Sequence, residues 1–153
     1  MRIVSGVAAM ALLAGCQQAS EVGADRAWVR LPGVAGRPGA AYFTIHGGAK
    51  PTTLVAVSAP FAIRAEMHES MPDMSMPMDH GMGSAMTMAP VKDVAVPANA
   101  NVAFAPGGKH VMLFDIAPRV QSGDTVPLTL QFADGRKIEV KAKVVGAGEA
   151  EPK

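Results

Sequence analysis

A cluster of methionine and histidine residues is the part of this sequence best suited to chemistry. Eight of the eleven methionines lie between Met67 and Met88, together with two of the four histidines. Thioether sulfur and imidazole nitrogen both suit a soft metal ion such as Cu(I). The stretch is also too rich in Pro, Gly and Asp to form a packed core element. These residue types indicate that the chain handles copper.

A second pair of candidate ligands, His110 and Met112, follows the turn Pro106-Gly107-Gly108. The pair lies in an apolar segment, and in a strand both side chains would leave the same face, with Cα atoms about 6.5–7 Å apart. One ion could then be reached by both. Alternation on a half-buried strand also places methionines in protein cores. The pair alone therefore fits either two metal ligands or two residues packed in a core.

The elements that must position these residues are predicted to be β-strands. Short runs rich in Val, Ile, Thr, Phe and Tyr recur about every ten residues between turn signals, which is typical of an antiparallel sandwich or barrel. Residues 137–145 alternate polar and apolar side chains, as a strand with one solvated face requires. The predicted strands are 27–31, 40–46, 53–58, 63–68, 91–96, 101–105, 110–116, 126–132 and 137–145.

This pattern also places individual residues. His68 ends one predicted strand and Met88 opens the next, so one end of a sandwich could collect ligands from three segments. Segment 70–85 between them is of low complexity and is predicted to be a mobile loop. Trp28 stands in an alternating strand and is predicted to lie in the core. Pro127 indicates an edge strand or a strand start.

The first residues have the pattern of an export signal. Arg2 is followed by an apolar run over 3–13 that is too short to span a bilayer, and the run ends in Leu13-Ala14-Gly15-Cys16. This ending resembles the lipobox of bacterial lipoproteins, in which the Cys is acylated. An alternative is a non-lipid signal cut near Ala14 or Ala19.

The lipobox resemblance implies a division of the chain and a location. Gln17 after the Cys resembles the pattern that sorts lipoproteins to the outer membrane, so we expect a periplasmic protein held at a membrane by its lipid. The expected parts are a signal peptide over 1–15, lipidation at Cys16, a lipid-anchored tether over 16–25, a domain over 26–146 and a polar tail over 147–153.

Composition excludes several classes of function. Cys16 is the only cysteine, so blue-copper and binuclear copper electron-transfer centres, and zinc sites built from cysteine, lack their ligand. The net charge is +1, and Lys and Arg are scattered singly without a basic stripe. Nucleic acid is therefore not an expected partner.

Several motifs together resemble the periplasmic copper chaperones called PCu(A)C. Met88, twenty-one further residues and then His110-x-Met112 match the family's signature, and His68 stands in the position of its first histidine. The resemblance covers residues 26–145. Other matching pieces are Ala27-Trp28-Val29-Arg30, Ala41-Tyr42-Phe43-Thr44-Ile45, Ala65-Glu66-Met67-His68-Glu69, Val96-Pro97-Ala98, the segment 106–113 and Pro127-Leu128-Thr129-Leu130-Gln131-Phe132.

The resemblance implies an all-β, cupredoxin-like, antiparallel Greek-key β-sandwich. It also implies that Cu(I) binds among His68, Met88, His110 and Met112. Two neutral imidazoles and two neutral thioethers retain Cu(I) without imposing the planar geometry that Cu(II) prefers. The implied function is a non-enzymatic copper chaperone that delivers copper to a client cuproprotein, such as the copper centre of a cytochrome c oxidase subunit.

The chain departs from the family between His68 and Met88, where nineteen residues exceed the usual spacing. His80 in this surplus could replace His68 or add to it, although the residues around His68 favour His68. The surplus is either a tolerated insertion or an element that holds a second copper ion, with Cu(II) considered as that ion. Its candidate ligands are Met71, Met74, Met76, Met78, His80, Met82 and Met86.

The same residues also fit functions other than that of a copper chaperone. A copper or silver buffering lipoprotein would use the Met-rich segment as its sink and bind several weaker ions. Copper oxidases need cysteine and clustered histidines, and a copper-zinc dismutase needs more than four histidines, so an enzyme is not expected. A metal-free adhesion or scaffold module is a further alternative. His46, beside Gly47-Gly48, is predicted to flank a turn rather than to bind metal.

Overall fold

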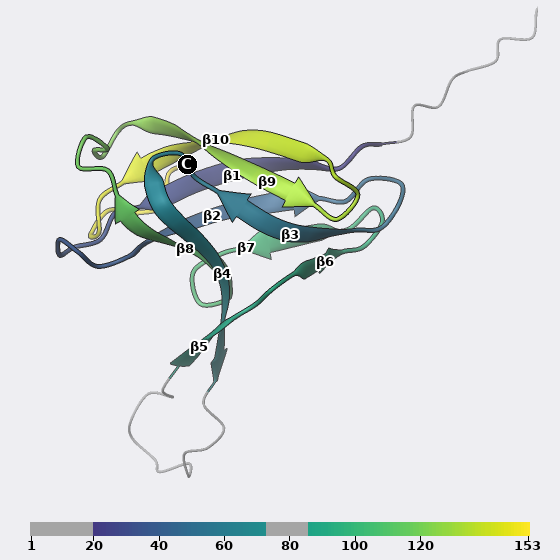
Figure 1. Cartoon of the computed structure of the whole chain (residues 1–153), viewed down its shortest axis with the longest axis horizontal. Coiled ribbons are helices and arrows are strands. Elements are labelled where there is room, and N and C mark those ends of the chain that lie inside the picture. Colours follow the sequence, from purple (N-terminus) through teal and green to yellow (C-terminus); the bar gives the residue numbers. More distant parts are fainter. Residues whose placement is uncertain (1–19, 73–85) are drawn as a thin grey trace, which may run out of the picture.

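A computed structural model of the chain describes residues 20–72 and 86–153. These residues form ten strands, shown in Figure 1. Among the described residues, no helix is long and apolar enough to cross a membrane. The strands are β1 Gly23–Arg30, β2 Gly39–His46, β3 Thr52–Ser58, β4 Ala62–Pro72, β5 Met86–Pro90, β6 Val94–Val96, β7 Asn101–Phe104, β8 Lys109–Ile116, β9 Thr125–Phe132 and β10 Lys137–Val145.

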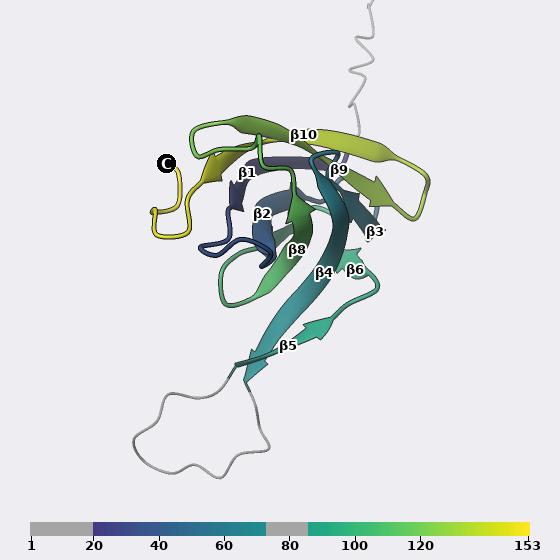
Figure 2. The ribbon, with the colours of Figure 1, turned by 60° about the vertical axis from the view of Figure 1, so that its left-hand side comes forward.

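The strands join in one hydrogen-bonded sheet in the order β5-β4-β8-β7-β2-β1-β10-β9-β3-β6. Pairing is antiparallel except for β1 with β10 and β7 with β8, which are parallel. The sheet curls until β3, near one end of this order, contacts β4, near the other. Figure 2 shows the resulting two-layered body, with β4 continuing past it beside β5. The predicted all-β sandwich is confirmed.

The core forms because alternate residues of each strand point inward. In β10 the burial pattern follows the sequence alternation, and in β2 and β8 the residues of the main core also alternate: Ala41, Phe43 and Ile45, and Val111 and Leu113. Phe43 of β2 packs on Phe104 of β7, with ring centroids 4.4 Å apart. The largest fully buried side chains are those of Phe43, Phe132, Ile45, Leu54, Leu113, Leu128, Leu130, Val29, Val96, Val111 and Val144.

Trp28 is buried, but it does not lie in this core. Its neighbour Val29 points into the main core, so Trp28 faces the other side of the sheet. There it packs on Tyr42, with ring centroids 4.3 Å apart, and Arg30 covers its ring. The predicted burial of Trp28 is confirmed, and the structure adds that Trp28 belongs to a second, smaller core cluster with Tyr42 and Val145.

Several predicted boundaries differ from the structure. β4 runs on to Pro72 and pairs with β5, so Ser70–Pro72 are strand rather than the start of a loop, while 73–85 lie outside the described residues. At the N-terminus β1 begins at Gly23, and Val22 packs in the core, within the stretch predicted as tether. In the predicted tail, the Glu149 carboxylate accepts a hydrogen bond from the Gly146 backbone N–H.

Pro127 lies near the start of β9, as predicted, but β9 is not an edge strand. It runs between β10 and β3 in the sheet. Its pairing with β3 covers only Thr129–Phe132, so Pro127 lies beyond the paired part on that side. The missing N–H of Pro127 therefore removes no bond between β9 and β3.

Candidate metal centre

The candidate ligands come together on three adjacent antiparallel strands, with β4 between β5 and β8. His68 of β4 lies directly opposite His110 of β8, and Met112 lies opposite Glu66. Cross-strand partners point to the same face, as do residues two apart within a strand. His68, His110 and Met112 therefore share one face, although His68 is far from the others in sequence.

Met88 reaches the same face from the other side of β4. It lies opposite Ser70, two residues beyond His68, and so shares the face of His68. We call the side of β5-β4-β8 that carries His68, Met88, His110 and Met112 the ligand face. The alternate residues Val111 and Leu113 of β8 point into the core, so the ligand face is the outer side of the sheet.

Burial differs between the two kinds of candidate ligand. His110 is only 6% exposed and the His68 side chain 13%, whereas Met88 is 57% exposed. Met112 is half-buried. The histidines thus form the floor of the ligand face, and Met88 lies where a partner could approach. An ion held here would remain within reach of an incoming ligand.

The two imidazole rings are close enough to share an ion. Their centroids lie 6.0 Å apart and their planes differ by 28°. Metal–nitrogen bonds to histidine are ~2 Å long, so this centroid separation is within the span of two rings bound to one ion.

His110 has a defined tautomer. Its Nδ1 lies 2.9 Å from the carbonyl oxygen of Gly108. A carbonyl only accepts, so Nδ1 must donate, and the neutral ring then keeps a free lone pair on Nε2. The same carbonyl accepts the Ser70 backbone N–H, which ties the turn before β8 to β4.

His68 has an unsatisfied nitrogen. Its Nδ1 is buried and has no hydrogen-bond partner, while Nε2 lies 3.4 Å from a carboxylate oxygen of Glu66. A buried polar atom without a partner costs about 1–3 kcal/mol. A bound metal ion would remove this cost, so the donor set fits a metal ligand at His68.

The site is not built from hard ligands. Within residues 20–72 and 86–153, no group of three or more His, Cys, Asp or Glu side chains is placed to hold a metal ion. The ligand face instead combines two imidazoles with two thioethers. Such a set suits a soft monovalent ion better than zinc or calcium.

The additional methionines of the Met-rich stretch fall into different environments. Met67 is buried in the core, and Met71 is 47% exposed on the face of β4 opposite to His68. Met86 begins β5, where its backbone pairs with Pro72. The other predicted secondary ligands, Met74, Met76, Met78, His80 and Met82, and the predicted lipidation site Cys16 lie outside the described residues.

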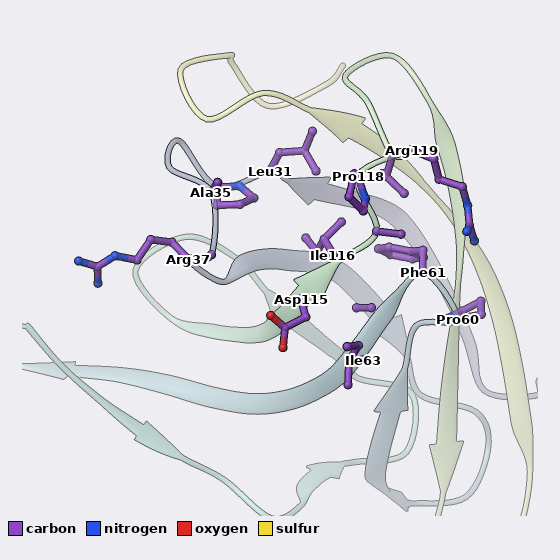
Figure 3. Close-up of a pocket in the computed structure, with 15 residues that line it drawn as sticks. Leu31, Ala35, Arg37, Pro60, Phe61, Ile63, Asp115, Ile116, Pro118 and Arg119 are labelled. Atoms are coloured by element: carbon purple, nitrogen blue, oxygen red, sulfur yellow. The ribbon is translucent and has the colours of Figure 1, made fainter.

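A groove of about 700 Å³, which the sequence did not reveal, lies elsewhere on the molecule. It is found where β4 begins and β8 ends, and Figure 3 shows Phe61, Ile63 and Ile116 along it. Asp115, which also lines it, has a φ of 54°, in the left-handed region that Asp tolerates. None of the four candidate ligands lines this groove, so it is separate from the ligand face.

His46 lies in a polar cluster apart from the other histidines. Its Nε2 lies 2.8 Å from a carboxylate oxygen of Asp25 and its Nδ1 lies 2.8 Å from the amide oxygen of Asn101, and both nitrogens donate when the ring is protonated. The hydrogen bond to Asp25 raises the pKa of His46, and the same bond lowers the pKa of Asp25. Both side chains are well solvated, so the contribution to stability is small.

The sign of this coupling follows from the two shifts. Stabilisation from His46 is present below its unfolded pKa and is lost as pH rises through the raised folded pKa. Stabilisation from Asp25 is present above its unfolded pKa and is lost as pH falls through the lowered folded pKa. The pair therefore stabilises the fold most between the ordinary values of 3.8 and 6.5.

We predict that an NMR titration will find the His46 pKa above its ordinary value, and that Asp25→Asn will lower it. Asn101→Ala should lower it less, because Asp25 supplies the larger hydrogen-bond contribution and a formal charge. An unchanged His46 pKa in Asp25→Asn would contradict this assignment. Metal binding should be the same in both variants, because His46 is not on the ligand face.

Comparisons with known proteins agree with this fold. A copper-bound PCuAC domain from PmoF2 matches with a TM-score of 0.63 and 19% identity, over 84% of this chain and 95% of that chain. The solution structure of Cu(I)-bound DR1885 from Deinococcus radiodurans matches with a TM-score of 0.55 and 30% identity, over 86% of this chain and 82% of that chain. The cupredoxin-like β-fold is therefore confirmed.

Sequence comparison adds a lipoprotein relative. The protein called "Putative lipoprotein Lxx21020" from Leifsonia xyli subsp. xyli is 27% identical over 129 residues, which cover 84% of this chain and 72% of that protein. The model of the family described as "Putative lipoprotein LpqE-like" matches residues 22–144, from the first core residue to the last strand. The chain therefore belongs to the LpqE-like lipoprotein family, and its fold is that of the PCuAC domains.

Proposed function

We propose that this protein is a copper chaperone that binds one Cu(I) ion through His68, Met88, His110 and Met112. The observation that carries the proposal is the strand register, which puts the four side chains on one face. The separation of 6.0 Å between the two histidine rings supports it. So does the similarity to a Cu(I)-bound protein at 30% identity.

The ligand set suits a carrier rather than a catalyst. Thioether and neutral imidazole hold Cu(I) without a net ligand charge and without the square-planar arrangement that favours Cu(II). The exposed Met88 can leave the ion and be replaced by a ligand of the acceptor while the buried histidines stay in place. Copper would then pass to the acceptor by stepwise ligand exchange and without a redox step.

The destination of the copper is a finer part of the proposal. The PCu(A)C resemblance points to a client cuproprotein, in particular the copper centre of cytochrome c oxidase. Membership in a lipoprotein family supports a position at a membrane of the cell envelope. Lipidation of Cys16 would hold the protein in the periplasm, with the outer membrane favoured by Gln17.

The test is an anaerobic titration of residues 17–153 with Cu(I) against a competing chelator. We expect one ion that binds tightly enough to be taken from the chelator. Reaction of the loaded protein with a copper-free oxidase copper-centre domain should then transfer the ion. Absence of any tight Cu(I) binding would refute the proposal.

A second candidate function, copper buffering, is favoured by one observation. Pro72 pairs with Met86, so the two residues that flank segment 73–85 lie opposite each other at the end of β4 and the start of β5, two residues beyond the pair of Ser70 and Met88. A segment with many thioethers could then collect further ions beside the ligand face. Buffering would appear as several weaker ions in addition to the tight one.

We predict that the segment can be removed without loss of the tight ion. Replacing residues 73–85 by Asn-Gly should keep the β4–β5 register, because a two-residue type I′ turn joins directly opposed strands. A matched control keeps the length of the segment but carries Met74→Leu, Met76→Leu, Met78→Leu, His80→Gln and Met82→Leu. Both variants should bind one tight Cu(I) and lose the weaker ions. Loss of the tight ion in both variants would favour the buffer over the carrier.

A further inference from the structure

The two histidines of the ligand face are held in different ways. His110 donates its Nδ1–H to the Gly108 carbonyl, so Nε2 is the nitrogen left to bind. His68 has the reverse arrangement, because its Nε2 faces the Glu66 carboxylate while its Nδ1 is buried without a partner. An ionised carboxylate only accepts hydrogen bonds, so the nitrogen that faces it carries the hydrogen.

From this arrangement we infer that Glu66 is a positioning residue that makes His68 bind copper through Nδ1, whereas His110 binds through Nε2. The inference rests on the proposed function, since it assigns atoms within the same site. The inference adds Glu66 to the site as a residue that acts on a ligand without binding the ion. Ligating histidines commonly donate their second N–H to a carboxylate, which fixes the tautomer and makes the ligand more basic.

Glu66 is itself held in place by two further residues. Its other carboxylate oxygen lies 3.3 Å from Nε of Arg64, and the Arg64 guanidinium lies over the Phe114 ring at 4.1 Å. Arg64 and Phe114 are directly opposed in the β4–β8 register. A row from Phe114 through Arg64 and Glu66 to His68 thus runs along the ligand face. The carboxylate is directed at His68 instead of turning freely into solvent.

The contact between Glu66 and His68 should strengthen when metal binds. At 3.4 Å it is longer than a typical N–H···O hydrogen bond. Metal coordination draws electron density from the ring and makes Nε2–H a better donor. We therefore expect the contact to shorten toward the ~2.8 Å of a charge-assisted hydrogen bond.

The choice of nitrogen also decides where the ion lies. Nδ1 is next to the ring carbon that carries Cβ, whereas Nε2 is at the far side of the ring. His68 would therefore hold the ion through the ring nitrogen nearer to its own backbone, and His110 through the ring nitrogen farther from its own backbone. Met88 of the neighbouring strand β5 is exposed, so it is the ligand that could exchange with a ligand of the acceptor.

The test uses the protein labelled with ¹⁵N in histidine and loaded with Cu(I) under anaerobic conditions. Long-range ¹H–¹⁵N spectra distinguish bound, protonated and free ring nitrogens because Cu(I) is diamagnetic. We expect metal-induced shifts at Nδ1 of His68 and at Nε2 of His110. Glu66→Ala should populate both tautomers of His68 and weaken Cu(I) binding by about 10–100-fold, the range usual for such outer partners.

Two further variants separate positioning from charge and from folding. Glu66→Gln keeps an oxygen that can accept the Nε2–H, so it should retain the Nδ1 signature with a smaller loss of affinity. Glu69→Ala removes the same charge from the residue after His68 in β4, on the opposite face, where Glu69 pairs with Lys109 at 2.7 Å instead of with a histidine. It should leave both the affinity and the His68 spectrum unchanged.

The results separate this inference from the proposed function. Copper bound to both histidines but through Nε2 of His68 would overturn the role of Glu66 and leave the chaperone proposal intact. The same conclusion would follow if Glu66→Ala matched Glu69→Ala in affinity and spectrum. No response of either histidine to Cu(I) would refute the proposed site, and this inference with it.

Discussion

We expect His110→Ala and Met112→Leu each to weaken Cu(I) binding by at least ~100-fold, above the range found when only an outer partner of a ligand is removed. Each variant removes one donor atom from the ligand face and leaves the strand register intact. Leucine at position 112 keeps nearly the same apolar volume as methionine, so it removes sulfur without opening a cavity. The loss should therefore report on coordination and not on packing.

The measurement is competition with a Cu(I) chelator, compared with His46→Ala as a control. His46 lies in the polar cluster with Asp25 and Asn101, so its replacement should leave Cu(I) affinity unchanged. The double variant His110→Ala/Met112→Leu should retain no tight ion. Tight binding that survives in the double variant would show that the ion is held elsewhere, and the Met-rich segment would be the first place to look.

The second large effect, on protein stability, is expected for a substitution at Leu113, one residue after Met112 in β8. Leu113 is fully buried and points into the core, so Leu113→Ala should lower the free energy of unfolding by about 2–5 kcal/mol. The removed methyl groups leave a cavity that the packed strands around it fill only in part. Met112→Leu, on the opposite face, should change stability by less than ~1.5 kcal/mol.

Urea denaturation of the metal-free protein measures this contrast. A lower midpoint with an unchanged slope would show that stability has changed and the exposed surface on unfolding has not. Folded Leu113→Ala should still take one tight Cu(I), and the ion should raise its stability by mass action. If the folded variant bound copper as weakly as His110→Ala, the separation of the two faces of β8 would be wrong.

The strands were predictable because their signal is local. In β10, polar and apolar residues alternate with period two, and burial on one face of a sheet produces that alternation. The strand predictions failed where a residue is in a strand only because a segment distant in the sequence pairs with it. Ser70–Pro72 look like a loop because of their polar residue and proline, yet they are strand because β5 returns beside them. The burial of Trp28 was predicted, but its place in a second cluster was not, since both faces of β1 are covered by apolar residues.

Some features of the candidate site are also local in the sequence, and others are not. The sequence by itself determined the soft character of the donors and the shared face of His110 and Met112, because both depend only on residue type and on the period of a strand. Only the tertiary structure decided that His68 lies opposite His110, that Met88 joins them from β5, and that Glu66 lies beside His68. Register between strands is non-local, and a slip of one residue would move every side chain of a strand to the other face. The spacing of the family signature implied which four residues are ligands, but it did not give the register that pairs them.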